Sequence, residues 1–280
     1  MAFIDSRAQS CGYTDFLNKY LTFPPPGPLP SPPSEASECD LWDDILNAVS
    51  LVNPCFDIYQ IATTCPLLWD VLGFPGSFNY LPTGAEIYFN RTDVQKAINA
   101  PIMPWTECGG PVFVGPNNTD QSPPSGLSVL PKVIERLNKT IIGHGALDYV
   151  LIANGTLLMI QNMTWKGEQG FRYAPTDDFY VPYHTLQDPM TLAGAGVFGT
   201  THTERGLTWV YTSLSGHMIP QYAPSASYRQ LEFLLGRIDS LSEVGSFTTD
   251  PGDLANTLGG KVTTSMKAHE FSGKVGVGRL

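Results

Sequence analysis

Apolar residues that recur once per helical turn predict four helices along this chain. Their ranges are 40–52, 93–100, 129–137 and 225–241, and the second ends where a proline follows. In the last helix, four apolar residues share the face that we expect to pack inward: Leu231, Leu234, Leu235 and Ile238. Such helices need a second layer of structure against which the apolar face is buried.

Two short runs in the second half predict strands for that layer. Residues 140–143 read as a buried strand, and residues 207–213 alternate between apolar and polar positions. Helices and strands therefore alternate, which indicates the α/β class. Asp148 and His217 each follow one of these strands. Because ligands and catalytic groups gather beyond the carboxyl ends of strands in α/β sheets, we expect the two side chains to lie within hydrogen-bonding distance.

The N-terminal third has a different character. Residues 23–33 form a polyproline-like run that cannot be a helix or an inner strand. The run is either a linker or a rigid surface excursion, and the cysteines on both sides of it favour the excursion.

The chain has five cysteines, at positions 11, 39, 55, 65 and 108. Four cysteines can pair in three ways. We expect the pairs Cys11–Cys39 and Cys55–Cys65, because each closes a short loop and stiffens it by reducing chain entropy. Cys108 is then left over. In an oxidising compartment, an odd cysteine suggests an intermolecular bond, a free thiol, or a partner on a segment outside this chain.

Composition narrows the classes of function. With 280 residues of which 42% are hydrophobic, the chain can bury a sizeable core. Its formal net charge of -10 disfavours nucleic acid or an anionic membrane as a partner. No apolar run approaches the ~18 residues of a membrane span, and the first residues lack a basic segment followed by an apolar one. We therefore expect neither a membrane span nor a signal peptide in this chain.

Five Asn-X-Ser/Thr sequons point instead to the secretory pathway, against coincidence in a threonine-rich chain. The sequons, the expected lack of a signal peptide and the odd cysteine together indicate that this chain is the C-terminal part of a longer protein. We expect that protein to be secreted or vacuolar. The asparagines are Asn90, Asn117, Asn138, Asn154 and Asn162.

Asp148 and His217 could be the acid and the base of a hydrolase triad. The carboxylate would accept a hydrogen bond from one ring nitrogen, fix the tautomer and stabilise the imidazolium that forms when the histidine takes a proton from a serine. The alternative is a turn aspartate that caps a helix and a loop histidine that hydrogen-bonds to the backbone.

The segments around these residues resemble the serine carboxypeptidases, the S10 peptidases. Residues 206–224, with Gly206-Leu-Thr-Trp209 and Ser215-Gly-His-Met-Ile-Pro-Gln221, are similar to the histidine region of that family. Residues 143–155 are similar to its aspartate region, and residues 93–98 to a segment before it. Cys11-Gly-Tyr-Thr-Asp15 and the cysteine loops resemble the insertion of fungal secreted members. The resemblance covers roughly residues 11–241.

The resemblance implies the C-terminal part of an α/β-hydrolase fold with a disulfide-bearing insertion. We expect the insertion at 1–90, the hydrolase core at 91–247 and a loose tail at 248–280. The implied reaction is removal of C-terminal residues from peptides at acid pH, so the expected ligand is the C-terminus of a peptide.

The family's functional residues carry over at four positions. Asp148 matches the triad acid and His217 the general base. Met218 matches a residue that lines the pocket for the departing C-terminal amino acid, although ordinary core packing is the alternative. Leu151 falls where the family's acyl-side pocket comes near.

The sequence departs from the family pattern at the nucleophile, and this difference determines how the chain could act. The nucleophile of this fold belongs in a Gly-X-Ser-X-Gly turn, and the sequence has no such motif. Ser77, Ser125 and Ser215 have the wrong neighbours. Two classes therefore remain open. The first is an enzyme whose serine lies either on a separate N-terminal chain or on an upstream part of one longer chain, and the second is a non-catalytic secreted glycoprotein derived from the family.

No cofactor is expected. The histidines are scattered, with no Cys/His cluster at the spacing of zinc ligands. The glycines at 194 and 196 lack the lysine of a phosphate loop, which argues against nucleotide binding.

Overall fold

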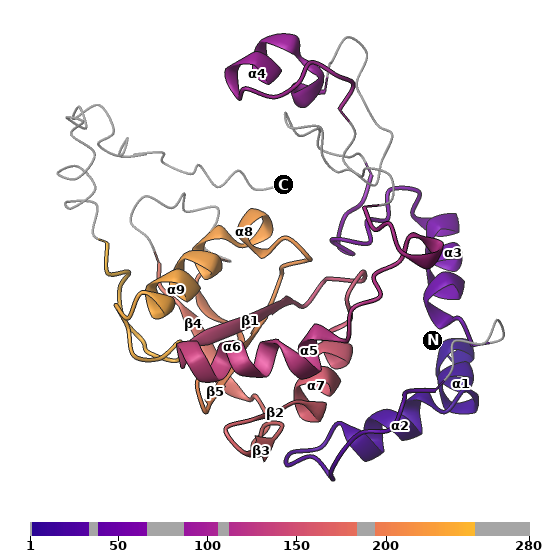
Figure 1. The fold of residues 1–280 in the computed structure, drawn as a ribbon, viewed down its shortest axis with the longest axis vertical. Coiled ribbons are helices and arrows are strands. Elements are labelled where there is room, and N and C mark those ends of the chain that lie inside the picture. Colours follow the sequence, from indigo (N-terminus) through magenta and orange to yellow (C-terminus); the bar gives the residue numbers. More distant parts are fainter. Residues whose placement is uncertain (1, 34–38, 66–86, 106–111, 184–193, 250–280) are drawn as a thin grey trace, which may run out of the picture.

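The computed structural model describes residues 2–33, 39–65, 87–105, 112–183 and 194–249 (Figure 1). A four-stranded sheet forms the centre of the described chain, and helices pack on both of its faces. The class is α/β, as the alternation of helical and strand patterns predicted. Cys108, Ser77 and the tail beyond 249 lie outside the described residues.

The strand order in the sheet is β1–β6–β5–β4. β1 runs parallel to β6, and the other two pairings are antiparallel. The register pairs Gly145 with Thr212, so that β1 and β6 end side by side at one edge of the sheet. Among the described residues β1 pairs with β6 alone, which leaves its other edge without a strand partner. The bounds are β1 Thr140–Gly145, β4 Asp177–Val181, β5 Gly196–Glu204 and β6 Leu207–Thr212.

Each face of the sheet has its own apolar core, because side chains alternate along β6. Val210 faces helices α8 (Ile219–Tyr222) and α9 (Pro224–Leu234), where it packs in one cluster with Phe179 and Phe233. Trp209 faces the opposite side.

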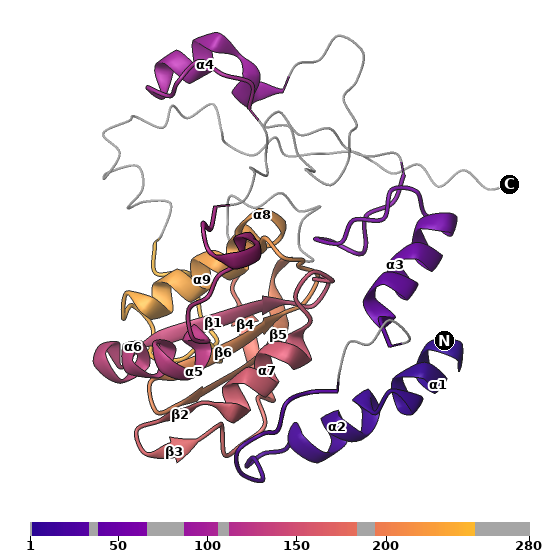
Figure 2. The ribbon, with the colours of Figure 1, turned by 45° about the vertical axis from the view of Figure 1, so that its right-hand side comes forward.

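The second core is filled by large side chains under helices α6 (Leu130–Leu137) and α7 (Ala153–Asn162). Trp209 is almost fully buried there, with Ile134 from α6 and Ile160 from α7. Figure 2 shows these helices on the side of the sheet away from α8 and α9. α6 ends at Leu137, and Asn138 takes the left-handed conformation at its C-cap.

The N-terminal helices form an arm beside the sheet: α1 Ala2–Ser10, α2 Tyr13–Tyr20 and α3 Leu41–Val52 (Figure 2). α3 begins after Asp40, whose side chain accepts the Asp43 N–H as an N-cap, and it confirms the predicted helix. The Cys11–Cys39 disulfide is the expected pair.

The proline-rich run is a surface excursion rather than a linker. It contains neither helix nor strand. The Leu29 N–H donates to the Asn162 side chain at 3.0 Å, and the Gln169 side chain donates to the Gly27 carbonyl at 2.7 Å. The Asn162 acceptor lies at the end of α7 and the Gln169 donor lies on β3 (Glu168–Gln169), so the run is held against these two elements.

The predicted inward face of the last helix was wrong. Leu231, Leu234 and Leu235 are exposed, and only Ile238 is buried. The helix also ends at Leu234 rather than 241, and Gly236 just beyond has a positive φ of 70°.

Two charged residues occupy the inner face of α9 instead. Arg229 and Glu232 form a fully buried ion pair at 2.9 Å. The Arg229 guanidinium also donates to the Glu243 carbonyl at 2.9 Å, and the Glu232 carboxylate accepts the Thr248 hydroxyl at 2.6 Å. Burial of a charge is tolerated when it is paired and hydrogen-bonded. The pair therefore holds residues 243–248 against α9, and Thr248, expected in the loose tail, is part of the packed structure.

The remaining elements are short. The helix expected at 93–100 spans only Thr92–Ala97 as α4. The others are η1 Tyr88–Asn90, η2 Pro116–Asn118, α5 Ser125–Ser128, β2 Thr164–Trp165 and β3 Glu168–Gln169. No helix in the described ranges combines the length and the apolarity that crossing a bilayer requires.

Candidate active site

Asp148 and His217 meet at the edge of the sheet where β1 and β6 end. The Asp148 Oδ2 and His217 Nδ1 atoms lie 2.9 Å apart. The geometric prediction from the sequence is therefore confirmed: two parallel strands that end side by side bring together residues that follow them. The carboxylate is 5% exposed, whereas the histidine side chain is 35% exposed, so the ring is accessible from solvent.

The two carboxylate oxygens of Asp148 have different partners. Oδ1 accepts the backbone N–H groups of Val150 at 2.9 Å and Leu151 at 3.1 Å. Oδ2 accepts from His217. The aspartate therefore stabilises its own turn with one oxygen and orients the histidine with the other. A carboxylate acceptor requires a proton on Nδ1, which leaves Nε2 of the neutral ring as a proton acceptor.

His144, one of the scattered histidines that no sequence pattern assigned to the site, lies beside this pair. Its ring stacks on Trp209 with centroids 5.9 Å apart, and its Nε2 lies 2.7 Å from the Leu151 carbonyl. The same nitrogen is 3.9 Å from Asp148 Oδ2. The four-residue spacing of His144 and Asp148 does not predict this contact, because the chain forms a turn rather than a helix between them.

Burial lowers the pKa of His144 from its ordinary value of 6.5. The Leu151 hydrogen bond and the Asp148 charge oppose this shift, and a charge on His217 adds to it. A neutral His144 donates from Nε2 to the Leu151 carbonyl and supports the turn that carries Asp148.

This shift predicts a loss of stability in acid. Below pH 6.5 the unfolded chain binds a proton at His144 that the folded chain does not, so the free energy of unfolding falls with pH. His144→Gln keeps a donor but removes the titration. We expect the Tm of the wild type relative to this variant to decrease between about pH 7.5 and about pH 5.5. A Tm difference that is independent of pH would contradict the assignment.

Three residues of the site had no signal in the sequence. The Tyr59 ring lies 5.5 Å from the His217 ring. Burial raises the pKa of the Asp57 carboxyl, despite the Tyr59 N–H that it accepts. Burial, followed by the charges of Asp57 and Asp148, raises the pKa of Tyr222 to about 12.

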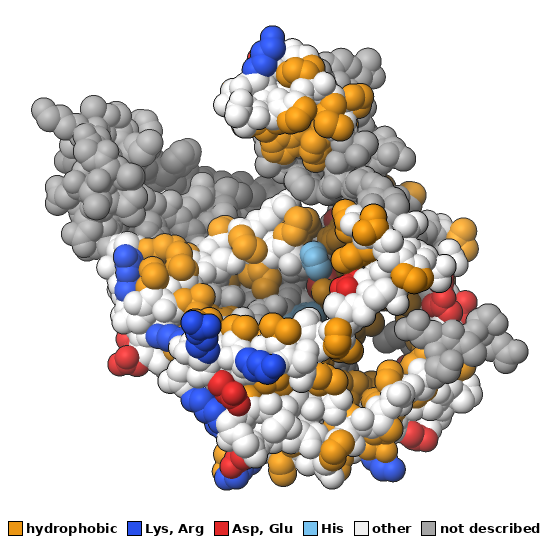
Figure 3. Space-filling model, in the orientation of Figure 1, with side chains coloured by type: hydrophobic (Ala, Val, Ile, Leu, Met, Phe, Trp, Pro, Cys, Tyr) orange, Lys and Arg blue, Asp and Glu red, His pale blue; other side chains and the backbone are white. Residues whose placement is uncertain are grey.

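Met218 and Leu151 flank the pair. Met218 is half-buried and immediately precedes α8, and Leu151 is exposed beside the Asp148 turn. In Figure 3 a histidine and an acidic side chain lie at a hollow bordered by hydrophobic side chains. The substrate-binding roles of Met218 and Leu151 stay predictions.

Ser215 is not placed to act as a nucleophile. It is fully buried, and its hydroxyl donates to the Gly216 carbonyl at 3.2 Å. The described residues contain no group of three or more His, Cys, Asp or Glu side chains that could hold a metal ion.

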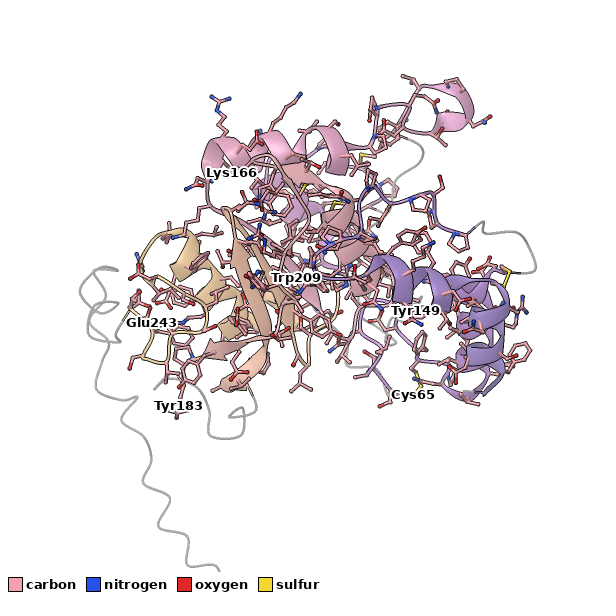
Figure 4. All side chains as sticks on the ribbon, turned by 90° about the horizontal axis from the view of Figure 1, so that it is seen from below. Cys65, Tyr149, Lys166, Tyr183, Trp209 and Glu243 are labelled. Atoms are coloured by element: carbon pink, nitrogen blue, oxygen red, sulfur yellow. A yellow bond between two sulfur atoms is a disulfide. The ribbon has the colours of Figure 1, made fainter. Side chains whose placement is uncertain are left out.

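The arm of N-terminal helices reaches the site through Tyr149, the residue after Asp148 (Figure 4). The rings of Trp42 and Tyr149 stack with centroids 5.3 Å apart. Trp42 Nε1 donates to the Tyr149 carbonyl at 2.8 Å, and the Tyr149 hydroxyl donates to the Trp42 carbonyl at 2.9 Å.

The sequons differ in exposure. Asn117, Asn138 and Asn154 are exposed, whereas Asn90 and Asn162 are partly buried. The Asn90 side-chain oxygen accepts the Trp105 N–H at 2.6 Å.

Comparison with known proteins identifies relatives of this chain. Residues 30–236 match the family model described as serine carboxypeptidase. A protein named probable serine carboxypeptidase from Arthroderma benhamiae is 61% identical over 241 residues, covering 86% of this chain and 45% of the relative. Serine-type carboxypeptidase F from Aspergillus niger is 46% identical over 259 residues, covering 86% of this chain and 48% of the relative.

A solved structure shares the fold. A prohormone-processing carboxypeptidase from Saccharomyces cerevisiae superposes with a TM-score of 0.50 at 18% identity, covering 87% of this chain and 49% of that structure. The fold is the α/β-hydrolase type, with a disulfide-bearing insertion. The chain spans less than half the length of these relatives. The match over residues 30–236 nevertheless covers most of the chain, which belongs to the serine carboxypeptidase family.

Proposed function

We propose that this chain supplies the acid and the base of a serine carboxypeptidase that removes C-terminal residues from peptides. The observation that carries the proposal is the 2.9 Å contact between Asp148 Oδ2 and His217 Nδ1, together with the 35% exposure of the histidine side chain. Family membership supplies the reaction class.

In this mechanism His217 transfers the proton, and Asp148 orients the His217 ring. Nε2 takes the proton of a serine hydroxyl while the serine oxygen bonds to the scissile carbonyl carbon, and the buried carboxylate stabilises the imidazolium. The imidazolium then gives the proton to the leaving amine as the C–N bond breaks. A water molecule repeats the sequence on the acyl-enzyme and restores the serine.

The serine comes from a separate N-terminal chain or segment. The absence of a Gly-X-Ser-X-Gly motif supports this, as does the coverage of less than half of each relative. The edge of β1 that pairs with no strand in the described ranges is a suitable place for that segment to continue the sheet. Exposed apolar side chains on α6, on α9 and just after α9 extend the surface: Val133, Leu137, Leu231, Leu234 and Leu235.

Met218 contacts the departing C-terminal residue in this proposal. It follows His217 directly, and its flexible thioether side chain can adapt to apolar side chains of different shape. Two disulfides and five sequons are consistent with a protein that folds in the secretory pathway and is secreted or vacuolar.

The test uses this chain co-expressed with the part of the Arthroderma benhamiae relative that this chain does not match. The purified pair is incubated with an N-blocked peptide at acid pH, and products are identified by mass spectrometry. We expect release of the single C-terminal amino acid, and no release from the same peptide with an amidated C-terminus. Cleavage of both peptides, or of neither by a folded pair, would contradict the proposal and favour a non-catalytic glycoprotein.

A further inference from the structure

The loop closed by the second disulfide contacts both members of the acid–base pair. This Cys55–Cys65 loop has turns and one isolated bridge, between Asp57 and Gln60. The backbone N–H of His217 donates to the Tyr59 carbonyl at 2.8 Å. Residues 58–61 of the loop therefore touch the backbone of the base itself.

The same four residues bond to both neighbours of the acid. The Tyr149 N–H donates to the Ile58 carbonyl at 2.9 Å, and the Ile61 N–H donates to the Leu147 carbonyl at 3.1 Å. Leu147 and Tyr149 stand on either side of Asp148. Three backbone hydrogen bonds thus link one short segment to the acid turn and to the base.

Packing at Gly216 leaves the loop little freedom to move relative to His217. A methyl group at Gly216 would overlap the Tyr59 carbonyl oxygen and would also lie 2.6 Å from the Gln60 side-chain oxygen. Only glycine allows the two segments to approach so closely. The position of the His217 backbone is consequently set by the position of Tyr59.

Three contacts restrict the conformation of the loop. The disulfide closes its ends, the Asp57 carboxylate accepts the Tyr59 N–H at 2.9 Å, and the Asn53 side chain donates to the Thr63 carbonyl at 2.9 Å. Figure 4 shows Cys65 on the same side of the sheet as Tyr149. The segment that contacts the pair is therefore held in a fixed shape.

We propose that the Cys55–Cys65 loop is a positioning element that sets the distance between Asp148 and His217. The inference rests on the proposed function. Asp148 and His217 lie beyond the last paired residues of their strands, in turns that share one backbone hydrogen bond, from the Leu147 N–H to the Ser215 carbonyl at 2.8 Å. The loop adds one bond at His217 itself and two beside Asp148, and a misplacement of about 1 Å can cost about 10²-fold in rate.

The other disulfide provides a matched control. Cys11–Cys39 spans 28 residues and Cys55–Cys65 spans 10, so loop-closure entropy predicts that losing the former costs at least as much stability. The described hydrogen bonds of residues 21–33 with other elements run to α7 and β3 rather than to the acid–base pair. A larger catalytic loss on removal of Cys55–Cys65 therefore reports positioning and not stability.

The experiment compares the double variants Cys55→Ser/Cys65→Ser and Cys11→Ser/Cys39→Ser in the two-chain enzyme. kcat is normalised to sites titrated with a fluorophosphonate, which excludes misfolded protein. For the first variant we expect kcat to fall about 10²-fold with KM nearly unchanged, while the second stays close to wild type. A loss of less than about tenfold relative to the control would overturn the inference.

A second pair of variants leaves both disulfides intact. Gly216→Ala displaces the Tyr59 carbonyl, whereas Gly245→Ala meets nothing within 4 Å. We expect the kcat loss of the loop variant in Gly216→Ala and wild-type kcat in Gly245→Ala. Equal values for the two would overturn the inference even if the cysteine variants fail to fold.

Hydrogen exchange separates this inference from the proposed function, because it needs no activity. In Cys55→Ser/Cys65→Ser we expect the amides of Tyr149 and His217 to lose protection relative to Cys11→Ser/Cys39→Ser. If the assembled pair is inactive but this loss occurs, the proposed reaction fails and the positioning by the loop stands. If protection is unchanged, the loop does not position the pair.

Discussion

Replacing His217 with alanine should lower kcat per mole of assembled two-chain enzyme by about 10⁴-fold to 10⁶-fold. The variant lacks the group that takes the proton of the serine and returns it to the leaving amine. KM should change little, because the ring contributes to the transition state rather than to ground-state binding. The measurement is hydrolysis of an N-blocked dipeptide by wild type and variant, with the same N-terminal partner.

His202→Ala is the matched control for this variant. His202 lies on β5, with its ring nitrogens 3.4 Å from Asp177 and 3.3 Å from Glu204. Loss of this histidine removes its contacts with these two carboxylates and should leave kcat per mole of assembled enzyme near that of the wild type. If the two alanine variants lose kcat equally, His217 has no specific role as base.

Asp148→Asn tests the second member of the pair with minimal change in shape. Asparagine keeps an oxygen for the Val150 and Leu151 N–H groups, but its amide cannot hold the same histidine tautomer. By analogy with the triad of serine proteases, kcat should fall about 10⁴-fold. A fall of that size in a protein with the wild-type Tm would separate the orienting role of Oδ2 from the turn-stabilising role of Oδ1.

The sequence predicted this pair because the required information is local. Residues 140–143 and 207–213 carry strand patterns, and each is followed within a few residues by an acid or a base. Parallel pairing of β1 with β6 is enough to bring the ends of the strands together. Nothing about the distant parts of the chain was needed for this prediction.

The residues around the pair were not predictable, because their contacts join segments far apart in the chain. Tyr59 contacts His217 from the disulfide loop, and no local pattern at either position signals the other. The inner face of α9 was wrong for a related reason. Arg229 and Glu232 are charged, so a hydrophobic pattern places them outward, whereas their mutual pairing and their bonds to residues 243–248 allow burial.

Expressed without a partner, this chain should show no carboxypeptidase activity and no labelling by a fluorophosphonate. Such reagents react with an activated serine, and Ser215 is buried with its hydroxyl bonded to the Gly216 carbonyl. The chain should also aggregate, because no described strand pairs with the outer edge of β1 and the leucines of α9 are exposed. Gel labelling and analytical ultracentrifugation measure the two effects.

Adding the N-terminal partner should restore labelling and prevent aggregation. The position of the label then identifies which chain supplies the serine and which supplies the base. We expect the fluorophosphonate on the partner chain, and loss of that label when His217 in this chain is changed to alanine. A serine is a weak nucleophile without its base. If labelling of the serine on the partner chain requires His217 on this chain, the two residues must therefore belong to one shared site. Labelling of this chain in the absence of a partner would show that it contains a nucleophile of its own, and the two-chain proposal would be wrong.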